Sequence, residues 1–325
     1  MLRVHFVVED REPAPRILAE LMGADAVITA GPDLPDLPDY EILVTGFPKR
    51  RHLEASPNLR ALIVPFAGAP AATVELLREF PAVSMHNVHY NVIPTAEMAV
   101  ALLLAASKVV IPADRNLRRG DWTLRFEPPP FMTLHGQSAL ILGYGQIGRY
   151  IAPICRALGM NVTGIRRTPS AADAGDVTPV HGPDALHHLL PEANVLLNVL
   201  PHTSETHELL GESEFALLPP DAIFVNIGRA DTVDEEALYT ALAGRRLLGA
   251  GLDVWYDYPK SKAERTQTYP SKFPFHELDN VVMSPHRAGF RAVDEGTRMD
   301  HVARLLRVAC AGGAMPNRID KELGY

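Results

Sequence analysis

Short apolar runs alternate with stretches of helical periodicity at the start of the chain. The strand-like runs are 4–8, 42–45 and 62–64, and helix-like stretches between them include 15–22 and 73–80. Buried strands read as brief apolar runs, whereas covering helices repeat their apolar positions at the helical period. The pattern predicts a small α/β unit, followed by a long apolar helix at about residues 95–110.

A second and more regular alternation begins at Ser138. Its apolar runs, with helical stretches between most of them, are 139–142, 161–165, 195–199, 222–226, 249–254 and 281–284. Apolar strands that alternate with helices predict a parallel, doubly wound Rossmann-type sheet with both faces covered. The first unit is expected to be a smaller, flavodoxin-like α/β domain.

The 325-residue length suits two domains. A proline run at 128–130 marks an extended loop before the second alternation, and a last helix at about 292–311 follows it. We expect that helix to pack back onto the first unit. The predicted division is a discontinuous domain of residues 1–107 plus 290–325 and a second domain of residues 108–289.

Composition narrows the classes of partner and compartment. The net charge of −8 disfavours nucleic acid or an anionic membrane as the main partner, because both require a cationic face. Cys155 and Cys310 are the only cysteines, which suits a reducing compartment. The N-terminus lacks the features of a signal peptide, and the longest apolar run, 98–106, is too short to span a bilayer. We expect a cytoplasmic protein.

A glycine motif stands between the first strand of the second unit and the helix after it. Gly143 permits a tight turn, Gly145 lets the backbone approach a pyrophosphate, and Gly148 lets helix and strand pack closely. The N–H groups of Gln146 and Ile147 would face the anion at the helix N-terminus. The alternative is an ordinary glycine-rich turn, but the strand–turn–helix context favours dinucleotide binding.

The end of the next strand indicates which dinucleotide binds. An acid there suits the ribose 2′-hydroxyl, but this chain carries Arg166 and Arg167. Guanidinium groups match phosphate geometry, so the sequence favours NADP(H), with NAD(H) possible. The alternative is a pair of solvated arginines beside a site that accepts either cofactor.

Three later strands end in residues that suit reduction of a 2-oxo acid. Arg229 can clamp a carboxylate and polarise the adjacent carbonyl, and His286 can supply or remove the hydroxyl proton. Asp253 could accept a hydrogen bond from the nicotinamide carboxamide. Taken singly, these residues could be a surface charge, an incidental histidine and a turn cap. Their shared position at the carboxyl ends of parallel strands favours the catalytic reading.

At this point the chain resembles the D-isomer-specific 2-hydroxyacid dehydrogenases, of the glyoxylate/hydroxypyruvate reductase type. Leu200 to Leu210 resembles the cofactor loop of that family, Asn226 to Arg229 its arginine signature and Ser284 to Gly289 its histidine signature. Ala67-Gly68 resembles its substrate-carboxylate loop, and Tyr90 to Glu97 its interdomain segment. The likeness implies substrate contacts from Ala67, Gly68, Asn91 and Arg229, and cofactor contacts from Leu200, Pro201, Thr206, Ile227, Gly228, Asp253 and Gly289. It also implies a homodimer, with substrate in a cleft between domains that excludes water on closure.

One position departs from the family. Tyr258 stands where a Glu usually pairs with the histidine, and Asp257 lies one residue away. A carboxylate raises the pKa of its histidine partner, whereas a tyrosine hydroxyl only orients the ring. The predicted catalytic set is therefore Arg229, His286 and Tyr258, with Asp257 as a substitute if the loop turns differently.

The sequence leaves alternatives open. A dinucleotide-binding regulatory protein with lost catalysis, or a dehydrogenase of another small anion such as formate, would also fit the tyrosine at 258. The segment 258–275 is expected to be a surface loop or a dimer arm, although its aromatic residues could instead enter the cleft of a partner. No motif for a metal site is found, and no metal is expected.

Overall fold

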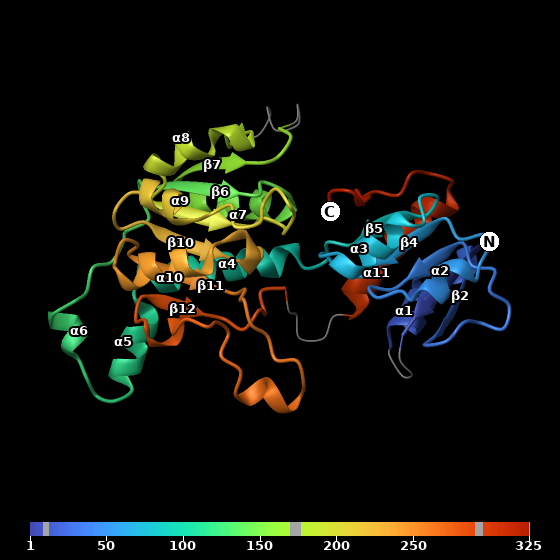
Figure 1. Cartoon of the computed structure of the whole chain (residues 1–325), viewed down its shortest axis with the longest axis horizontal. Coiled ribbons are helices and arrows are strands. Elements are labelled where there is room, and N and C mark those ends of the chain that lie inside the picture. The colour runs from blue at the N-terminus through green and yellow to red at the C-terminus, as the bar shows by residue number, and fades with distance from the viewer. Residues whose placement is uncertain (9–12, 170–176, 290–294, 325) are drawn as a thin grey trace. The chain divides into compact units, whose positions relative to one another are not determined.

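The computed structural model describes residues 1–8, 13–169, 177–289 and 295–324 (Figure 1). It divides into two compact units, Met1–Asn91 with Arg291–Tyr325, and Val92–Phe290. The long apolar helix α4 (Val92–Ser107) therefore groups with the larger unit, whereas the sequence-based boundary at residue 107 placed it in the smaller one. The reason is packing, since α4 lies against α7, β10 and β11 of the larger unit.

The smaller unit is built on a parallel five-stranded sheet of order β2-β1-β3-β4-β5, the order of flavodoxin-like folds. Its strands are β1 (Leu2–Val7), β2 (Ala26–Gly31), β3 (Ile42–Val44), β4 (Ala61–Val64) and β5 (Ser84–Asn87), and its helices are α1 (Ala14–Met22), α2 (Arg50–Glu54), α3 (Ala71–Arg78), α11 (Glu295–Cys310) and the 3-10 turn η1 (Gly23–Asp25). Alternate residues serve opposite faces: Ile63 joins the core under α1 and α11, and Leu62 joins the other core. The helix after the second unit does return to the first unit, as expected.

The larger unit contains a parallel seven-stranded sheet of order β12-β11-β10-β9-β6-β7-β8, a Rossmann-type order with one added strand. Its strands are β6 (Ser138–Leu142), β7 (Asn161–Ile165), β8 (Val180–His181), β9 (Val195–Asn198), β10 (Ile223–Asn226), β11 (Gly249–Leu252) and β12 (Val281–Met283). Its further α-helices are α5 (Val110–Leu117), α6 (Thr123–Phe126), α7 (Gln146–Ala157), α8 (Leu186–Leu189), α9 (Glu212–Leu217) and α10 (Glu235–Ala243). Its 3-10 helices are η3 (Pro183–Ala185), η4 (Leu190–Glu192), η5 (Ala230–Thr232), η6 (Ala263–Thr266) and η7 (Phe275–Glu277).

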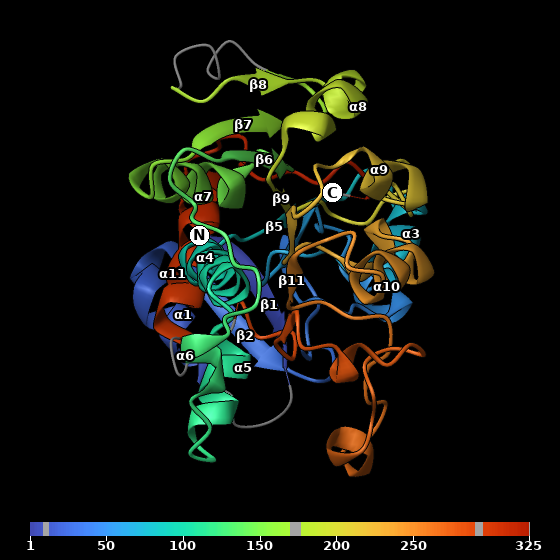
Figure 2. The ribbon, with the colours of Figure 1, turned by 90° about the vertical axis from the view of Figure 1, so that its left-hand side faces the viewer.

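Helices cover both faces of this sheet, with α4 and α7 on one side and α9 and α10 on the other (Figure 2). The strand residues alternate accordingly: Ile141 packs beneath α4 and α7, and Leu140 faces the opposite core. At Gly251 the helix comes so close that an added Cβ would lie 2.7 Å from the Cβ of Leu102. A glycine at this point of β11 lets α4 rest directly on the sheet.

No single helix within the described ranges is long and apolar enough to cross a membrane. Only α4 and α5 taken together reach the required length and composition, and they are bent by 65°.

Candidate active site

All strands of the larger sheet are parallel, so their carboxyl ends share one edge. The glycine motif follows β6, the arginine pair follows β7, Arg229 follows β10 and His286 follows β12. The neighbouring strands β6 and β9 run to helices on opposite faces of the sheet, which is where such folds bind ligands. The fold thus brings the predicted cofactor and reaction residues to the same edge.

The glycine turn has the shape that a pyrophosphate requires. Gly143 has φ +92°, and an added Cβ would lie 2.9 Å from the carbonyl carbon of Val199. At Gly148 an added Cβ would lie 2.8 Å from the oxygen of Gly143, whereas nothing lies within 4 Å of one at Gly145. Since α7 begins at Gln146, the amides of its first turn have no intrahelical acceptor and are available to an anion. These observations fit a bound dinucleotide.

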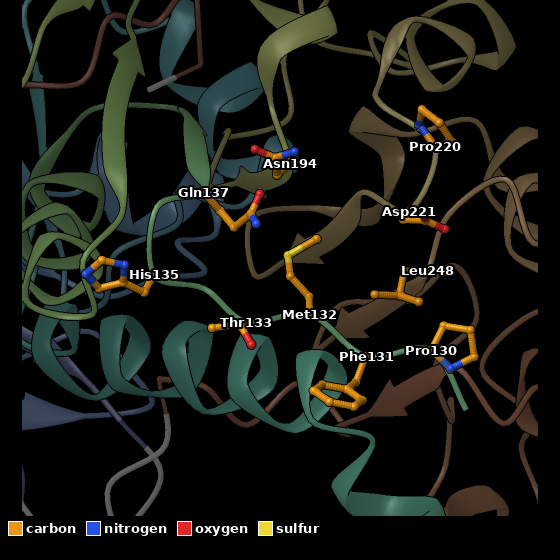
Figure 3. Close-up of a pocket in the computed structure, with 10 residues that line it drawn as sticks. All are labelled: Pro130, Phe131, Met132, Thr133, His135, Gln137, Asn194, Pro220, Asp221 and Leu248. Carbon is orange, nitrogen blue, oxygen red and sulfur yellow. The ribbon is translucent and has the colours of Figure 1, made fainter. Parts of the chain in front are cut away.

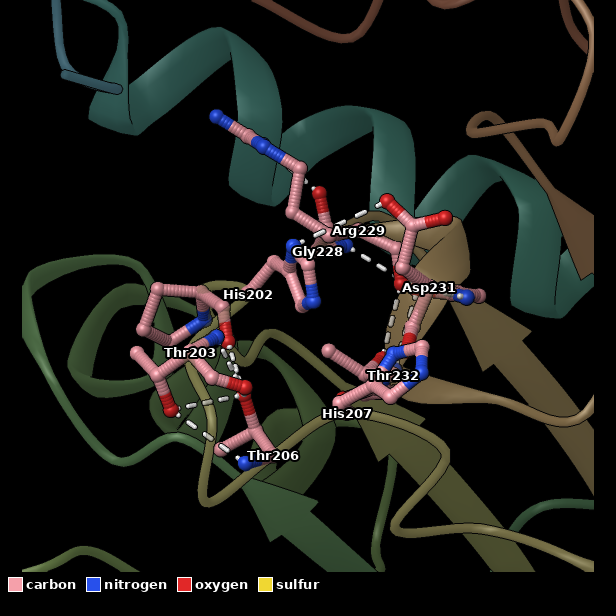
Figure 4. A network of polar contacts seen from close by, with 11 residues as sticks. His202, Thr203, Thr206, His207, Gly228, Arg229, Asp231 and Thr232 are labelled. Carbon is pink, nitrogen blue, oxygen red and sulfur yellow. Dashed lines mark hydrogen bonds and ion pairs between the residues drawn. The ribbon is translucent and has the colours of Figure 1, made fainter. Parts of the chain in front are cut away.

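The loops after β9 and β10 lie against each other beside this turn. An added Cβ at Gly228 would lie 2.6 Å from the carbonyl oxygen of Leu200. Thr206 donates its hydroxyl to the oxygen of Pro201 over 2.7 Å, and the Gly228 amide donates to Oδ1 of Asn226 over 3.1 Å (Figure 4). The loop residues predicted to hold cofactor are therefore ordered by contacts of their own.

The arginine pair lies directly after β7. The Arg166 amide donates to the oxygen of His181, which extends the pairing of β7 with β8. The side chain of Arg167 forms an ion pair with Glu205 of the β9 loop, with Nε and Oε2 3.2 Å apart. No acid occupies the strand end itself, so the electrostatic character there is cationic.

Arg229 is half-buried at the carboxyl end of β10. Its Nη1 donates to the oxygen of Gly228 over 2.7 Å, and in Figure 4 its guanidinium points away from Thr206. Burial lowers the pKa of Arg229, and the nearby Tyr258 and Asp231 oppose that shift. A guanidinium held in this way retains donors for an incoming carboxylate.

His286 follows β12 in a left-handed backbone conformation, with φ +51°. Its Nδ1 lies 2.8 Å from the hydroxyl of Tyr258, and that hydroxyl also accepts the Trp255 amide over 3.1 Å. Burial lowers the pKa of His286, Arg229 lowers it further, and Asp253 opposes both. Arg229 and His286 are thus electrostatically coupled, and Tyr258 is the side chain on the imidazole.

Asp253 is fully buried at the end of β11. Its Oδ1 accepts from the Ser284 hydroxyl over 2.5 Å and from the Arg287 amide over 2.9 Å, and Oδ2 accepts from the Ala288 amide over 2.7 Å. The carboxylate therefore anchors the loop that carries His286. Its predicted contact with a carboxamide stays a prediction, as does the cofactor contact of Gly289.

The remaining predicted site residues lie in the smaller unit. Ala67 and Gly68 follow β4, and Asn87 donates to the oxygen of Ala67 over 2.5 Å. Asn91 ends the first segment of that unit. The substrate contacts of Ala67, Gly68 and Asn91 stay predictions. His86 of the same unit is buried and lies within hydrogen-bonding distance of the Pro316 carbonyl and the Ser84 hydroxyl.

The loop after Tyr258 uses most of its aromatic residues within its own unit. Phe273 stacks on Tyr239 with ring centroids 5.1 Å apart, and Phe275 is buried against Trp255. Tyr269 stays 65% exposed. The idea that these aromatics enter a partner's cleft is therefore wrong for Phe275 and stays a prediction for Phe273 and Tyr269.

A cavity of about 370 Å³ lies away from these residues (Figure 3). Gln137, Asn194, Asp221 and Leu248 line it, and each lies one or two residues before β6, β9, β10 or β11, respectively. It is therefore at the amino-terminal edge of the sheet, opposite the candidate site. Among the described residues no cluster of three or more His, Cys, Asp or Glu could hold a metal ion.

A glycine-built dinucleotide cradle beside an arginine and a histidine defines an oxidoreductase with a nicotinamide cofactor. Residues 100–288 match the family model for the NAD-binding domain of D-isomer specific 2-hydroxyacid dehydrogenases. A glyoxylate reductase of Thermococcus onnurineus is 30% identical over 99% of this chain and 92% of its own length. Glyoxylate/hydroxypyruvate reductase B of Klebsiella pneumoniae is 32% identical over 72% of this chain and 70% of its own length.

Two solved structures show the same fold. A D-isomer specific 2-hydroxyacid dehydrogenase from Xanthobacter autotrophicus, solved with NADPH and MES, has a TM-score of 0.82 at 23% identity over 99% of both chains. An NADPH-dependent glyoxylate/hydroxypyruvate reductase from Sinorhizobium meliloti has a TM-score of 0.71 at 22% identity over 99% of this chain and 98% of its own. The chain belongs to the D-isomer specific 2-hydroxyacid dehydrogenase family. It is an NAD(P)-dependent oxidoreductase of small 2-oxo or 2-hydroxy acids.

Proposed function

We propose that this protein is an NADP(H)-preferring reductase of short 2-oxo acids of the glyoxylate or hydroxypyruvate type. The cofactor preference rests on Arg166 and Arg167, which follow β7 where an acid would favour the unphosphorylated ribose. The substrate class draws on the glyoxylate reductases to which the chain is similar. NADPH supplies the hydride when bound.

The residues of the chain bind the substrate and supply the proton. Arg229 holds the substrate carboxylate and draws electron density toward the carbonyl oxygen. His286 gives that oxygen its proton, and Tyr258 holds the imidazole. The backbone at Ala67 and Gly68, with Asn91, contributes further contacts to the substrate.

The placement of Arg229 and His286 is the observation that carries this proposal. They follow β10 and β12 at the same edge of the larger sheet as the glycine turn, and Tyr258 holds the imidazole, so the clamp and the proton donor can serve one small ligand. A protein that only binds a dinucleotide has no need of such a pair, and this favours catalysis over a regulatory role.

The test is NADPH oxidation by the full-length protein with glyoxylate, hydroxypyruvate, pyruvate and longer 2-oxo acids, with formate and NADP⁺ as the comparison. Turnover highest with two- or three-carbon 2-oxo acids supports the proposal. Binding of NADPH without turnover of any of them would refute it.

A homodimer is also proposed, because the segment that carries α5 and α6 exposes many large apolar side chains. They are Val110, Ile111, Leu117, Trp122, Phe126 and Phe131. Clustered apolar exposure of this kind marks an interaction surface. Sedimentation equilibrium of the full chain is expected to give twice the 35.6 kDa mass, and a monomer at micromolar concentration would refute the dimer.

A further inference from the structure

The protons around Tyr258 can be counted. Its hydroxyl oxygen lies 3.1 Å from the Trp255 amide nitrogen and 2.8 Å from Nδ1 of His286. The amide can only donate, so the oxygen accepts there. The phenol keeps its one proton for a second partner, and with that proton directed at Nδ1 the imidazole nitrogen is the acceptor. Neutral His286, accepting at Nδ1, carries its own proton on Nε2.

A carboxylate in this position would produce the opposite tautomer. It only accepts, so it requires a proton on Nδ1 and leaves Nε2 of a neutral ring without one. With Tyr258 as the donor to Nδ1, the neutral ring presents a proton at Nε2. Because the group facing Nδ1 is then a donor and not only an acceptor, the neutral imidazole as well as the imidazolium can act as the acid.

We propose that Tyr258 is a positioning residue that keeps the proton of neutral His286 on Nε2 and replaces it through Nδ1 during reduction. This rests on the proposed function. As the carbonyl carbon gains the hydride, the carbon–oxygen π pair moves onto oxygen, which takes the Nε2 proton. Nδ1 takes the phenol proton at the same time, and the resulting tyrosinate regains a proton from water. Tyr258 is 43% exposed, so water reaches it.

The surrounding charges favour this relay over an imidazolium acid. Arg229, from the end of β10, disfavours a positive ring and stabilises a tyrosinate. Asp253, from the end of β11, acts in the opposite sense on both groups, as Asp231 does on Tyr258, but the Asp253 carboxylate is occupied by three donors. Burial, the largest cause, lowers the pKa of His286, which favours the neutral ring, and raises that of Tyr258, which keeps the phenol protonated before the reaction.

The pH profile of reduction distinguishes the two acids. For the wild type we expect kcat/KM for the 2-oxo acid to stay level from roughly pH 6 to 9. In Tyr258→Phe only the imidazolium can donate, so kcat/KM should fall about tenfold per pH unit above the His286 pKa. Tyr258→Glu should hold a level rate to a higher pH than the phenylalanine variant before it falls. Tyr269→Phe, at an exposed tyrosine of the same loop, is the control and should match the wild type.

A readout that needs no turnover separates this inference from the proposed function. ¹⁵N spectra of the histidine rings in the NADPH complex, with His286→Asn to assign the signal, report which nitrogen is protonated. We expect a protonated Nε2 and a bare Nδ1 above pH 7, with the pattern reversed in Tyr258→Glu. A protonated Nδ1 in the wild type, or a Tyr258→Phe pH profile parallel to that of the wild type, would overturn the relay even if 2-oxo acids are reduced.

Discussion

The two halves of the carboxyl edge of the larger sheet use different parts of the chain. After β6 the important positions are places without side chains: Gly143 in its left-handed turn and Gly145 beside open space. After β10, β11 and β12 they are side chains with defined partners, such as Tyr258 against His286. One half offers a backbone surface for the cofactor, and we call it the cofactor half. The other half, the reaction half, offers charged and titratable side chains.

This difference predicts how each half responds to substitution. An added methyl group in the cofactor half should reduce binding while leaving the reaction chemistry intact. A removed side chain in the reaction half should slow the reaction while leaving cofactor binding intact. The arrangement allows each effect to be measured separately.

The largest effect is expected for Arg229→Ala. Loss of a preorganised, half-buried cation costs roughly 3–4 kcal/mol of transition-state stabilisation, or about 10²–10³ in rate. We expect kcat/KM for the 2-oxo acid to fall by about that factor, with KM raised and kcat lowered, while the Kd of NADPH changes by less than about twofold. Arg229→Lys keeps the positive charge without the bidentate guanidinium geometry and should recover part of the lost kcat/KM. If NADPH binding were lost instead, Arg229 would belong to the cofactor half.

Next in size is the effect of Gly145→Ala. The φ of Gly145 is −97°, outside the left-handed region that favours glycine, and nothing lies within 4 Å of the new Cβ. The melting temperature should therefore stay unchanged, while the Kd of NADPH rises by about 10–100-fold because the methyl group occupies space meant for phosphate. Calorimetric titration and thermal melts measure both quantities.

Gly143→Ala is the matched comparison. Its φ of +92° and the carbonyl 2.9 Å from the added Cβ should lower the stability by about 1–3 kcal/mol as well as the affinity. A variant at 145 that melts early, or one at 143 that melts normally, would contradict this account of the turn.

A smaller effect is expected for Arg166→Ala combined with Arg167→Ala. The Kd of NADPH should rise by about 10–30-fold and that of NADH by less than about twofold, since only the former carries the 2′-phosphate. Fluorescence titration of both reduced cofactors measures the ratio. Equal losses would show that the arginines support the loop rather than a phosphate.

The sequence predicted the strands that end at the site better than the edges of the sheets. Buried runs such as 161–165 coincide with β7. The edge strand β2 (Ala26–Gly31) was missed because only its first residue is buried, and β5 (Ser84–Asn87) because its buried residues include a histidine and an asparagine. These strands are fixed by pairing with neighbours, and no local pattern indicates that pairing.

Contacts distant in sequence also decided details of the site. The segment from Thr232 to Glu235 has the spacing of a capping box, but Asp234 rather than Thr232 caps α10, accepting the Ala237 amide over 2.7 Å. The Thr232 hydroxyl instead donates to the oxygen of Arg229 and accepts from Asn198. Likewise, the sequence left open whether residue 257 or 258 meets His286, and the structure places Tyr258 there. Loop register of this kind depends on packing.

The smallest expected effect tests an ion pair within the cofactor half of the edge. Glu205 pairs with Arg167 over 3.2 Å, with 61% of its own side chain exposed. An exposed pair of this kind is worth at most about 1 kcal/mol. Removing the acid in Glu205→Gln removes a charge that pairs with Arg167 and would repel the 2′-phosphate, so NADPH should bind about two- to fivefold more tightly and NADH equally well. The gain should shrink in high salt, because a partly exposed pair is screened. Weaker NADPH binding in this variant would mean that Glu205 orients Arg167 for the phosphate, and the arginine end of the sheet would then depend on a side-chain partner as the histidine end does.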